Sequence, residues 1–177
     1  DAIRFDQISQ LMANKDKPRI AISWRGGKDA NGEIRSMQLA ELMIGLPVTA
    51  EVEVISLQYD EGYEQEVITH GDRRVALSGL NNRFDLEGVF ALIKCCDAVI
   101  TVDNAVAHFS AALGVPAAVL IPAAQTQYRW KQPEIKQLLF PSASLFVQNK
   151  PGDWVPPVEA AWGYVLEMAG NKSVRSQ

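Results

Sequence analysis

Apolar residues gather along the chain in six short, nearly continuous runs that are typical of β-strands. The clearest runs are RIAISW, VEVISL, AVITV and AAVLI. Strands that are covered on both faces have such patterns, because neither face of their sheet meets water. The predicted strands cover residues 19–24, 52–57, 74–77, 98–102, 117–121 and 145–147.

Between these runs, apolar residues recur at three- and four-residue intervals, which is the spacing of amphipathic helices. The predicted helices cover residues 37–44, 85–94, 104–113 and 155–168. Asp85 and Asn104 stand where N-caps are expected, and Pro156 and Pro157 suit a first turn. Strands that alternate with helices predict a Rossmann-like α/β fold, an open parallel sheet with helices on both faces.

A chain of 177 residues fits a single domain. Residues 1–18 are interpreted as a lead-in helix or linker, residues 19–170 as the Rossmann-like domain, and residues 171–177 as a flexible tail. The chain begins with Asp1 and has no initiator methionine, which suggests a piece of a longer protein.

Composition narrows the class of protein. Hydrophobic residues make up 47% and charged residues 21%, which argues against disorder. The net charge is −4 and no long basic run is present, which argues against a nucleic-acid partner. The adjacent Cys95 and Cys96 form no disulfide framework, and two reduced thiols favour the cytoplasm. No apolar stretch reaches about 18 residues, so no transmembrane segment is expected.

The most informative segment is CDAVITVDNAVAHFSAALGVPAAVLIP, which predicts a strand, a sharp turn, a helix, a turn and another strand. Asp103 ends the first strand, Asn104 caps the helix, and His108 lies one turn later on the same face. Ligands of open α/β sheets bind at such strand ends, and a helix N-terminus suits a phosphate. Taken singly, His108 also fits a structural role and the Asp-Asn pair a simple cap. Their shared place favours a phosphate site.

A second polar segment, SWRGGKDANGEIRS, follows the first predicted strand. Its glycines allow close backbone approach, and Arg25, Lys28 and Arg35 supply positive charge. The segment is either a flexible solvated loop or a second wall of a diphosphate site. It matches neither a Walker A motif nor G-x-G-x-x-G, which sets aside a dinucleotide oxidoreductase.

Three further residues lie near the predicted strand ends. Gln58 closes the second strand, and its amide is interpreted as a hydrogen-bonding group for a base or a sugar. Arg129 and Trp130 follow the strand at residues 117–121, where they either flank the same crevice or pack as a pair.

The segment ITVDNAVAHFSAALGVPAAVLIP resembles the C-terminal-domain signature of heptosyltransferase-like glycosyltransferases, family nine. It is most similar to the branch fused to tetratricopeptide repeats. Further similar pieces appear in the same order between residues 19 and 154: IAISWRGG, RSMQLAEL, SLQYD, FDLEGVFALIKCCDAVIT, YRW and LFVQNKPGDW. The resemblance implies the C-terminal half of a GT-B fold, which binds a nucleotide-sugar donor.

The resemblance also implies which residues form the donor site. Asp103, Asn104, Ala105 and His108 would line the diphosphate and sugar pocket, although many family members have Asp, Ser or Thr, and Gly at the first three positions. With the residues of the first loop and the strand ends, the predicted donor-binding set is Ser23, Arg25, Gly26, Arg35, Gln58, Asp103, Asn104, Ala105, His108 and Arg129. No metal or other cofactor is implied, since positive side chains and helix N–H groups would stabilise the leaving diphosphate.

The expected function is donor binding in a glycosyltransferase that transfers a glycosyl group from a nucleotide diphosphate sugar to an unknown acceptor. The partner of this chain would be an N-terminal acceptor domain that supplies the general base. We expect no catalytic base within these 177 residues, so the isolated chain should be inactive. Two alternatives remain, a nucleotide-sugar epimerase domain of the same architecture and a degenerate, non-catalytic binding module.

Overall fold

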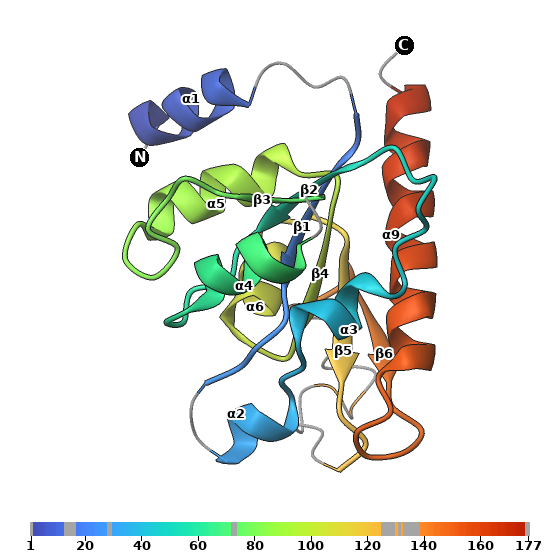
Figure 1. The fold of residues 1–177 in the computed structure, drawn as a ribbon. Helices are drawn as coiled ribbons and strands as arrows, with labels where there is room; N and C mark the ends of the chain where they lie inside the picture. Colours follow the sequence, from blue (N-terminus) through green and yellow to red (C-terminus); the bar gives the residue numbers. More distant parts are fainter. Residues whose placement is uncertain are drawn as a thin grey trace.

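The computed structural model describes residues 2–12, 17–27, 30–71, 74–124, 130, 132 and 139–175. Six parallel strands within these residues form one sheet in the order β3-β2-β1-β4-β5-β6 (Figure 1). The strands are β1 (Arg19–Ser23), β2 (Glu53–Ser56), β3 (Val75–Leu77), β4 (Ala98–Val102), β5 (Ala117–Ile121) and β6 (Ala143–Val147). The predicted Rossmann-like α/β fold is confirmed.

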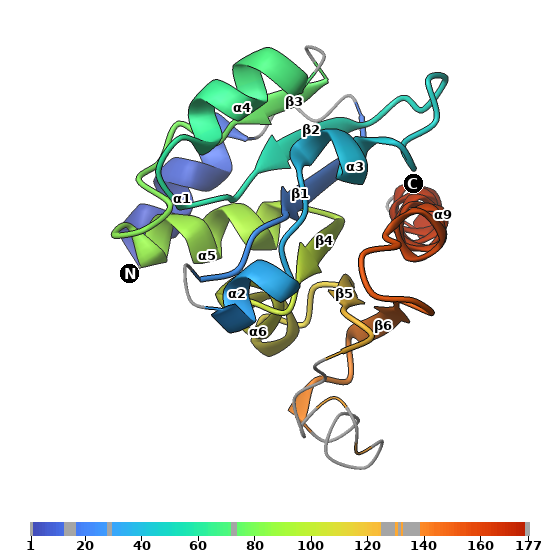
Figure 2. The same cartoon turned by 60° about the horizontal axis from the view of Figure 1, so that its bottom comes forward.

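Helices cover both faces of the sheet (Figure 2). On one face lie α3, α4 and α9, and on the other lie α5 and α6, with α1 packed against α5. The described helices are α1 (Ala2–Leu11), α2 (Ala30–Ile34), α3 (Leu39–Met43), α4 (Tyr63–His70), α5 (Leu86–Cys95), α6 (Ala105–Ala112) and α9 (Val155–Arg175).

The core consists of two apolar layers, one on each side of the sheet. Successive strand residues point to opposite faces, so Ile100 packs into the layer under α9, while Val99 packs into the layer under α5 and α6. All five residues of β1, β4 and β5 are buried. This double coverage explains why these strands are continuous apolar runs rather than alternating ones.

Local capping chemistry sets the ends of two helices. The Asp85 side chain accepts a hydrogen bond from the Gly88 amide at the start of α5, and the Asn104 side chain accepts one from the Val106 amide at the start of α6. Both predicted N-caps are therefore confirmed. After α6, Gly114 adopts a φ of 70°, the left-handed conformation that commonly terminates a helix.

Several boundaries differ from the sequence prediction. Helix α2 lies inside the glycine-rich segment that was interpreted as loop, and α4 was not predicted. Among the described residues of α4 only Val67 is buried, so this helix has no apolar periodicity to detect. Strand β6 begins at residue 143, two residues before the predicted start, and α9 continues beyond the expected boundary at residue 170.

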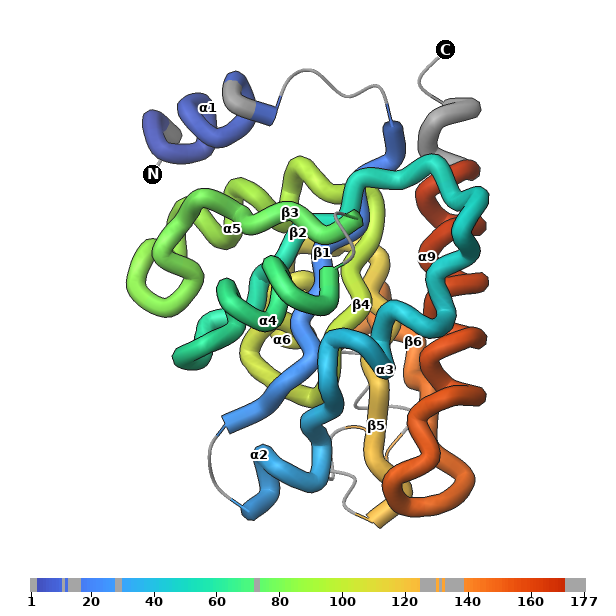
Figure 3. Tube along the Cα trace, viewed as in Figure 1, coloured from blue at the N-terminus to red at the C-terminus, as the bar shows by residue number. Residues whose placement is uncertain are grey.

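The carboxyl ends of the central strands meet at one edge of the sheet. Ser23 of β1 pairs with Thr101 of β4, so the loops that follow these strands begin side by side. The tube view shows β1 leading down into residues 24–27 and then α2 (Figure 3). From β4 the chain turns into α6 on the opposite face. The neighbours β1 and β4 therefore form the topological switch point, where open α/β sheets bind ligands.

Candidate functional site

Asn104 ties the two loops of the switch point together. Its Oδ1 accepts hydrogen bonds from Val106 N at 2.9 Å and Thr101 Oγ1 at 3.0 Å. Its Nδ2 donates to Ser23 Oγ at 2.8 Å and to the Arg25 carbonyl at 3.0 Å. Asn104 thus caps α6 and also fixes the end of β1 to the end of β4.

Gln58 links the end of β1 to the end of β2 in a similar way. Its Oε1 accepts hydrogen bonds from Ser23 Oγ, Trp24 N and Arg25 N at 2.8–3.0 Å. Its Nε2 donates to Asp60 Oδ1 at 2.8 Å. Ser23 and Gln58 are both fully buried. Both side chains hold the loop that follows β1, and the contact of Gln58 with a base or a sugar stays a prediction.

Arg25 is enclosed by two carboxylates. Its Nε donates to Asp60 Oδ2 at 2.7 Å and its Nη2 to Asp60 Oδ1 at 3.2 Å. Its Nη1 pairs with Glu66 Oε2. Burial lowers the pKa of Arg25, but the hydrogen bonds and negative charges of Asp60 and Glu66 outweigh it, so the net pKa is raised. This guanidinium is charged, and each of its three nitrogens donates a hydrogen bond to a carboxylate.

The glycines of this segment allow two backbone stretches to touch. A Cβ on Gly32 would lie 1.6 Å from the Gly27 carbonyl oxygen, so only glycine fits there. Ser36 closes the contact, because its Oγ accepts a hydrogen bond from Gly26 N at 3.0 Å and donates to the Gly32 carbonyl at 2.6 Å. The described part of this segment therefore combines a close backbone contact with the short helix α2.

Arg35 meets Asp103 beside the start of α6. The Arg35 Nη1 lies 3.7 Å from Asp103 Oδ2, and the two side chains are 18% and 2% exposed. Among the described residues, the buried Nε of Arg35 has no hydrogen-bond partner. The structure thus brings Arg35, Gly26, Asp103 and Asn104 together at the switch point. The exposed Ala105 is the first residue of α6.

His108 lies one turn into α6, within an aromatic group. Its ring stacks on Trp130 with centroids 5.6 Å apart and planes 15° apart, and its centroid is 5.1 Å from that of Phe140. Trp130 is buried, which supports its packing role. Arg129, the remaining predicted site residue, and Lys28 lie outside the described residues.

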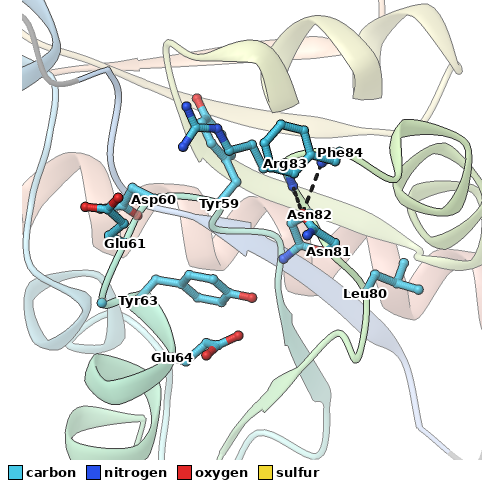
Figure 4. Close-up of a pocket in the computed structure, with 11 residues that line it drawn as sticks. Tyr59, Asp60, Glu61, Tyr63, Glu64, Leu80, Asn81, Asn82, Arg83 and Phe84 are labelled. Atoms are coloured by element: carbon cyan, nitrogen blue, oxygen red, sulfur yellow. Dashed lines mark hydrogen bonds between the residues drawn. The ribbon is translucent and has the colours of Figure 1, made fainter.

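A pocket of about 460 Å³ lies between the loops that follow β2 and β3 (Figure 4), and Asp60, the partner of Arg25, is one of its lining residues. Tyr59, Tyr63 and Phe84 provide aromatic rings, and the Tyr63 phenol and the Glu64 carboxylate point into the space between the loops. The Arg83 guanidinium lies 5.4 Å from the centroid of the Phe84 ring.

Two phenols of this pocket have raised pKa values. Burial raises the pKa of Tyr63, and the adjacent Glu64 carboxylate raises it further. Burial also raises the pKa of Tyr59, where the positive charge of Arg35 opposes the shift. Burial is thus the main cause of both shifts.

Sequence reasoning missed the pocket and the carboxylates that fix its edge. Asp60 and Glu66 were not singled out, because their partner Arg25 lies 35 and 41 positions away in the sequence. The SLQYD stretch that contains Asp60 was the available signal, but no local pattern marks Glu66.

Two classes of site can be assessed in the described ranges. These ranges contain no group of three or more His, Cys, Asp or Glu side chains placed to hold a metal. Every helix within them is too short or too polar to cross a membrane.

Comparisons with known proteins agree with the fold of this chain. Two solved structures are similar: E. coli ADP-heptose LPS heptosyltransferase II, with 17% identity and a TM-score of 0.64, and a family 9 glycosyl transferase from Veillonella parvula DSM 2008, with 14% identity and a TM-score of 0.58. The matches cover 94% and 97% of this chain but 52% and 51% of the other chains. The chain therefore spans about half the length of these structures, and the likeness concerns the fold.

A search of curated proteins found no match. Residues 35–129, more than half of the chain, match the model of glycosyltransferase family 9 (heptosyltransferase). This span includes Arg35, the pocket loops and all of α6. The chain belongs to glycosyltransferase family 9, the heptosyltransferase family.

Proposed function

We propose that this chain binds the nucleotide-sugar donor of a glycosyltransferase and forms the C-terminal half of a GT-B enzyme. Family membership supports glycosyl transfer as the activity of the whole protein. The length of the chain, about half that of the similar structures, agrees with one half of a two-domain enzyme. The proposal also places the chain in the branch of the family that is fused to tetratricopeptide repeats, and only the resemblance of the sequence supports that placement.

One observation carries the proposal, namely the meeting of Arg35 and the start of α6 at the switch point. The first turn of a helix has a partial positive charge and suits phosphate oxygens. Arg35 adds a full positive charge beside Asp103, and its Nε lies 3.1 Å from where a Cβ on Gly26 would be, so a glycine there lets the guanidinium lie close to the backbone. We therefore assign the donor diphosphate to the N-terminus of α6, which is called the mouth of α6 below.

The nucleoside would then occupy the pocket between the loops that follow β2 and β3. Aromatic rings there would stack on a base, and carboxylates such as Glu64 would accept hydrogen bonds from base N–H or ribose hydroxyl groups. The two halves of the donor must lie next to each other, and this arrangement is supported by Asp60, which lines the pocket and pairs with Arg25 at the end of β1.

In the proposed reaction, the bond between the anomeric carbon and the diphosphate oxygen breaks while the acceptor nucleophile bonds to that carbon. The acceptor proton passes to a base outside this chain. Arg35 and the dipole of α6 stabilise the negative charge that develops on the leaving diphosphate, so the proposal includes no metal. His108, whose ring is held by Trp130 and Phe140, would face the sugar side of the site.

Calorimetric titration with ADP-, GDP-, UDP- and CDP-sugars tests this function. We use ligand up to about 1 mM, where a binding free energy near −4 kcal/mol is measurable. We expect saturable binding of one base class, weakened in His108→Ala and unchanged in the control His70→Ala, whose exposed histidine lies on α4. Absence of binding to all four donors by the folded protein would contradict the proposal.

A further inference from the structure

Glu66 of α4 joins three separate segments at the edge of the proposed donor site. Its Oε2 accepts a hydrogen bond from Trp24 Nε1 at 3.0 Å and pairs with Arg25 Nη1. Its Oε1 accepts a hydrogen bond from Leu39 N, at the start of α3, at 2.7 Å. The Glu66 side chain is only 10% exposed, so its contacts are shielded from water.

Asp60 completes the enclosure of Arg25. With Nε and Nη2 on Asp60 and Nη1 on Glu66, all three guanidinium nitrogens have carboxylate partners. Two carboxylates around one guanidinium leave a net charge of about −1, which repels an anion. Arg25 is therefore a poor phosphate ligand in this arrangement, although its charge and its loop suggested that role.

The backbone next to this ion cluster is held as firmly as the side chains. Gln58 accepts hydrogen bonds from the amides of Trp24 and Arg25, and Asn104 donates to the Arg25 carbonyl. The next residue along the chain is Gly26, where an added Cβ would lie 3.1 Å from Arg35 Nε. The positions of residues 24 and 25 therefore determine where the next two residues, Gly26 and Gly27 (the glycine segment), lie relative to Arg35.

We propose that Glu66 is a positioning residue of the donor site. By fixing Trp24 and Arg25, it holds the glycine segment clear of the start of α6 and leaves Arg35 as the cation that faces the diphosphate. This inference rests on the proposed function. It makes Arg25 a structural ion-pair partner and separates the roles of two arginines that lie ten positions apart.

The sign of the effect of Glu66→Gln distinguishes positioning from simple electrostatics. The substitution removes a negative charge near an anionic ligand, which alone would tighten binding. Loss of the charged hydrogen bonds to Trp24 and Arg25 would loosen the segment and weaken binding. We therefore expect about tenfold weaker binding of the nucleoside diphosphate that the wild type binds, with a smaller change for the matching nucleoside.

The control is Glu159→Gln, which makes the same change of charge at an exposed position on α9. Its affinity should equal that of the wild type. In an Arg25→Ala background, the effect of Glu66→Gln should shrink, because both substitutions remove the same contact. Unchanged or tighter binding in Glu66→Gln would overturn the inference.

Amide hydrogen exchange gives a readout that does not depend on any nucleotide. In Glu66→Gln, the amides of residues 24–27 should exchange about tenfold faster, while those of β4 and β5 keep wild-type rates. If wild-type protein binds no nucleotide, the donor proposal fails while this exchange result still judges Glu66. Equal exchange of residues 24–27 in both proteins would refute the positioning role.

Discussion

Individual polar residues at the switch point serve the fold as much as they serve a ligand. Asn104, Ser23 and Gln58 are buried and engage one another or the backbone around them. A buried polar group without a partner is costly, so such a network must be complete to be tolerated. Asp103 and Arg35 differ, since their contact is long and lies at the mouth of α6.

Replacing Asn104 by Asp should separate its two roles. The carboxylate still caps α6 through Oδ1, but it cannot donate to Ser23 Oγ or to the Arg25 carbonyl. We expect the free energy of unfolding to fall by about 2–3 kcal/mol, measured by urea denaturation. Asn149→Asp, at an exposed position, should change it by less than about 0.5 kcal/mol. Equal losses in the two variants would refute the tie between the loops.

Gly32 offers a second test at the residue scale. In Gly32→Ala the new Cβ would clash with the Gly27 carbonyl, so we expect the free energy of unfolding to fall by about 2 kcal/mol or more. In the control Gly163→Ala, the Cβ meets open space on α9, and better helix propensity should raise stability by up to about 1 kcal/mol. Urea denaturation of both variants checks these signs. A neutral Gly32→Ala would mean that the two backbone stretches do not touch.

At the scale of elements, burial on one or both faces decides what the sequence reveals. Strands β1, β4 and β5 are covered on both faces, so their sequences are nearly continuous apolar runs that can be recognised without a structure. Helices α5 and α6 could be predicted because each begins at a side chain that commonly caps helices, Asp85 and Asn104. Helices α2 and α4 bury few residues, so packing and neighbouring segments determine them. Edge strand β6 is only partly buried, so its first residue is hard to locate from the apolar pattern.

The docking of α1 on α5 should depend on pH through Asp85. The hydrogen bond from Arg4 holds the pKa of Asp85 below its usual value of 3.8, and the Gly88 amide lowers it further. A depressed folded-state pKa stabilises the protein above the unfolded value and loses this effect as the pH falls through the folded value. The stability difference between wild type and Asp85→Asn should therefore be largest above pH 3.8 and shrink below it.

Urea denaturation between about pH 2 and pH 6 measures this difference. The control is Asp6→Asn, the same substitution at an exposed position on α1, measured over the same range. A constant gap between wild type and Asp85→Asn across this range would contradict the Arg4–Asp85 pairing.

At the scale of the whole molecule, strand order creates the site. The alternation of strands and helices predicted a parallel sheet, and the switch point arises because β1 and β4 are neighbours. Their adjacency brings Arg35 to Asp103, which are 68 positions apart in the sequence. The individual residues were therefore predictable as candidates, but contacts such as Arg25 with Glu66 depend on tertiary packing that no local pattern contains.

Arg35 and Arg83 should behave differently toward a diphosphate. Arg35→Ala removes the cation at the mouth of α6, so inorganic diphosphate should bind about tenfold or more weakly. Arg83→Ala removes an equal charge on the far loop of the pocket, beside Phe84, and should change this affinity little. Calorimetric titration compares both with wild type, and equal effects would argue against a local diphosphate site.

The most direct test of the account is to locate the diphosphate on the protein. We would record amide proton–nitrogen spectra while titrating the nucleoside diphosphate that binds. The account predicts that the largest shifts fall on residues 105–107 at the start of α6 and on residues 26–27 of the glycine segment. Shifts confined to other surfaces, such as the groove lined by Leu46, Val48 and Val52, with residues 105–107 unmoved, would contradict it.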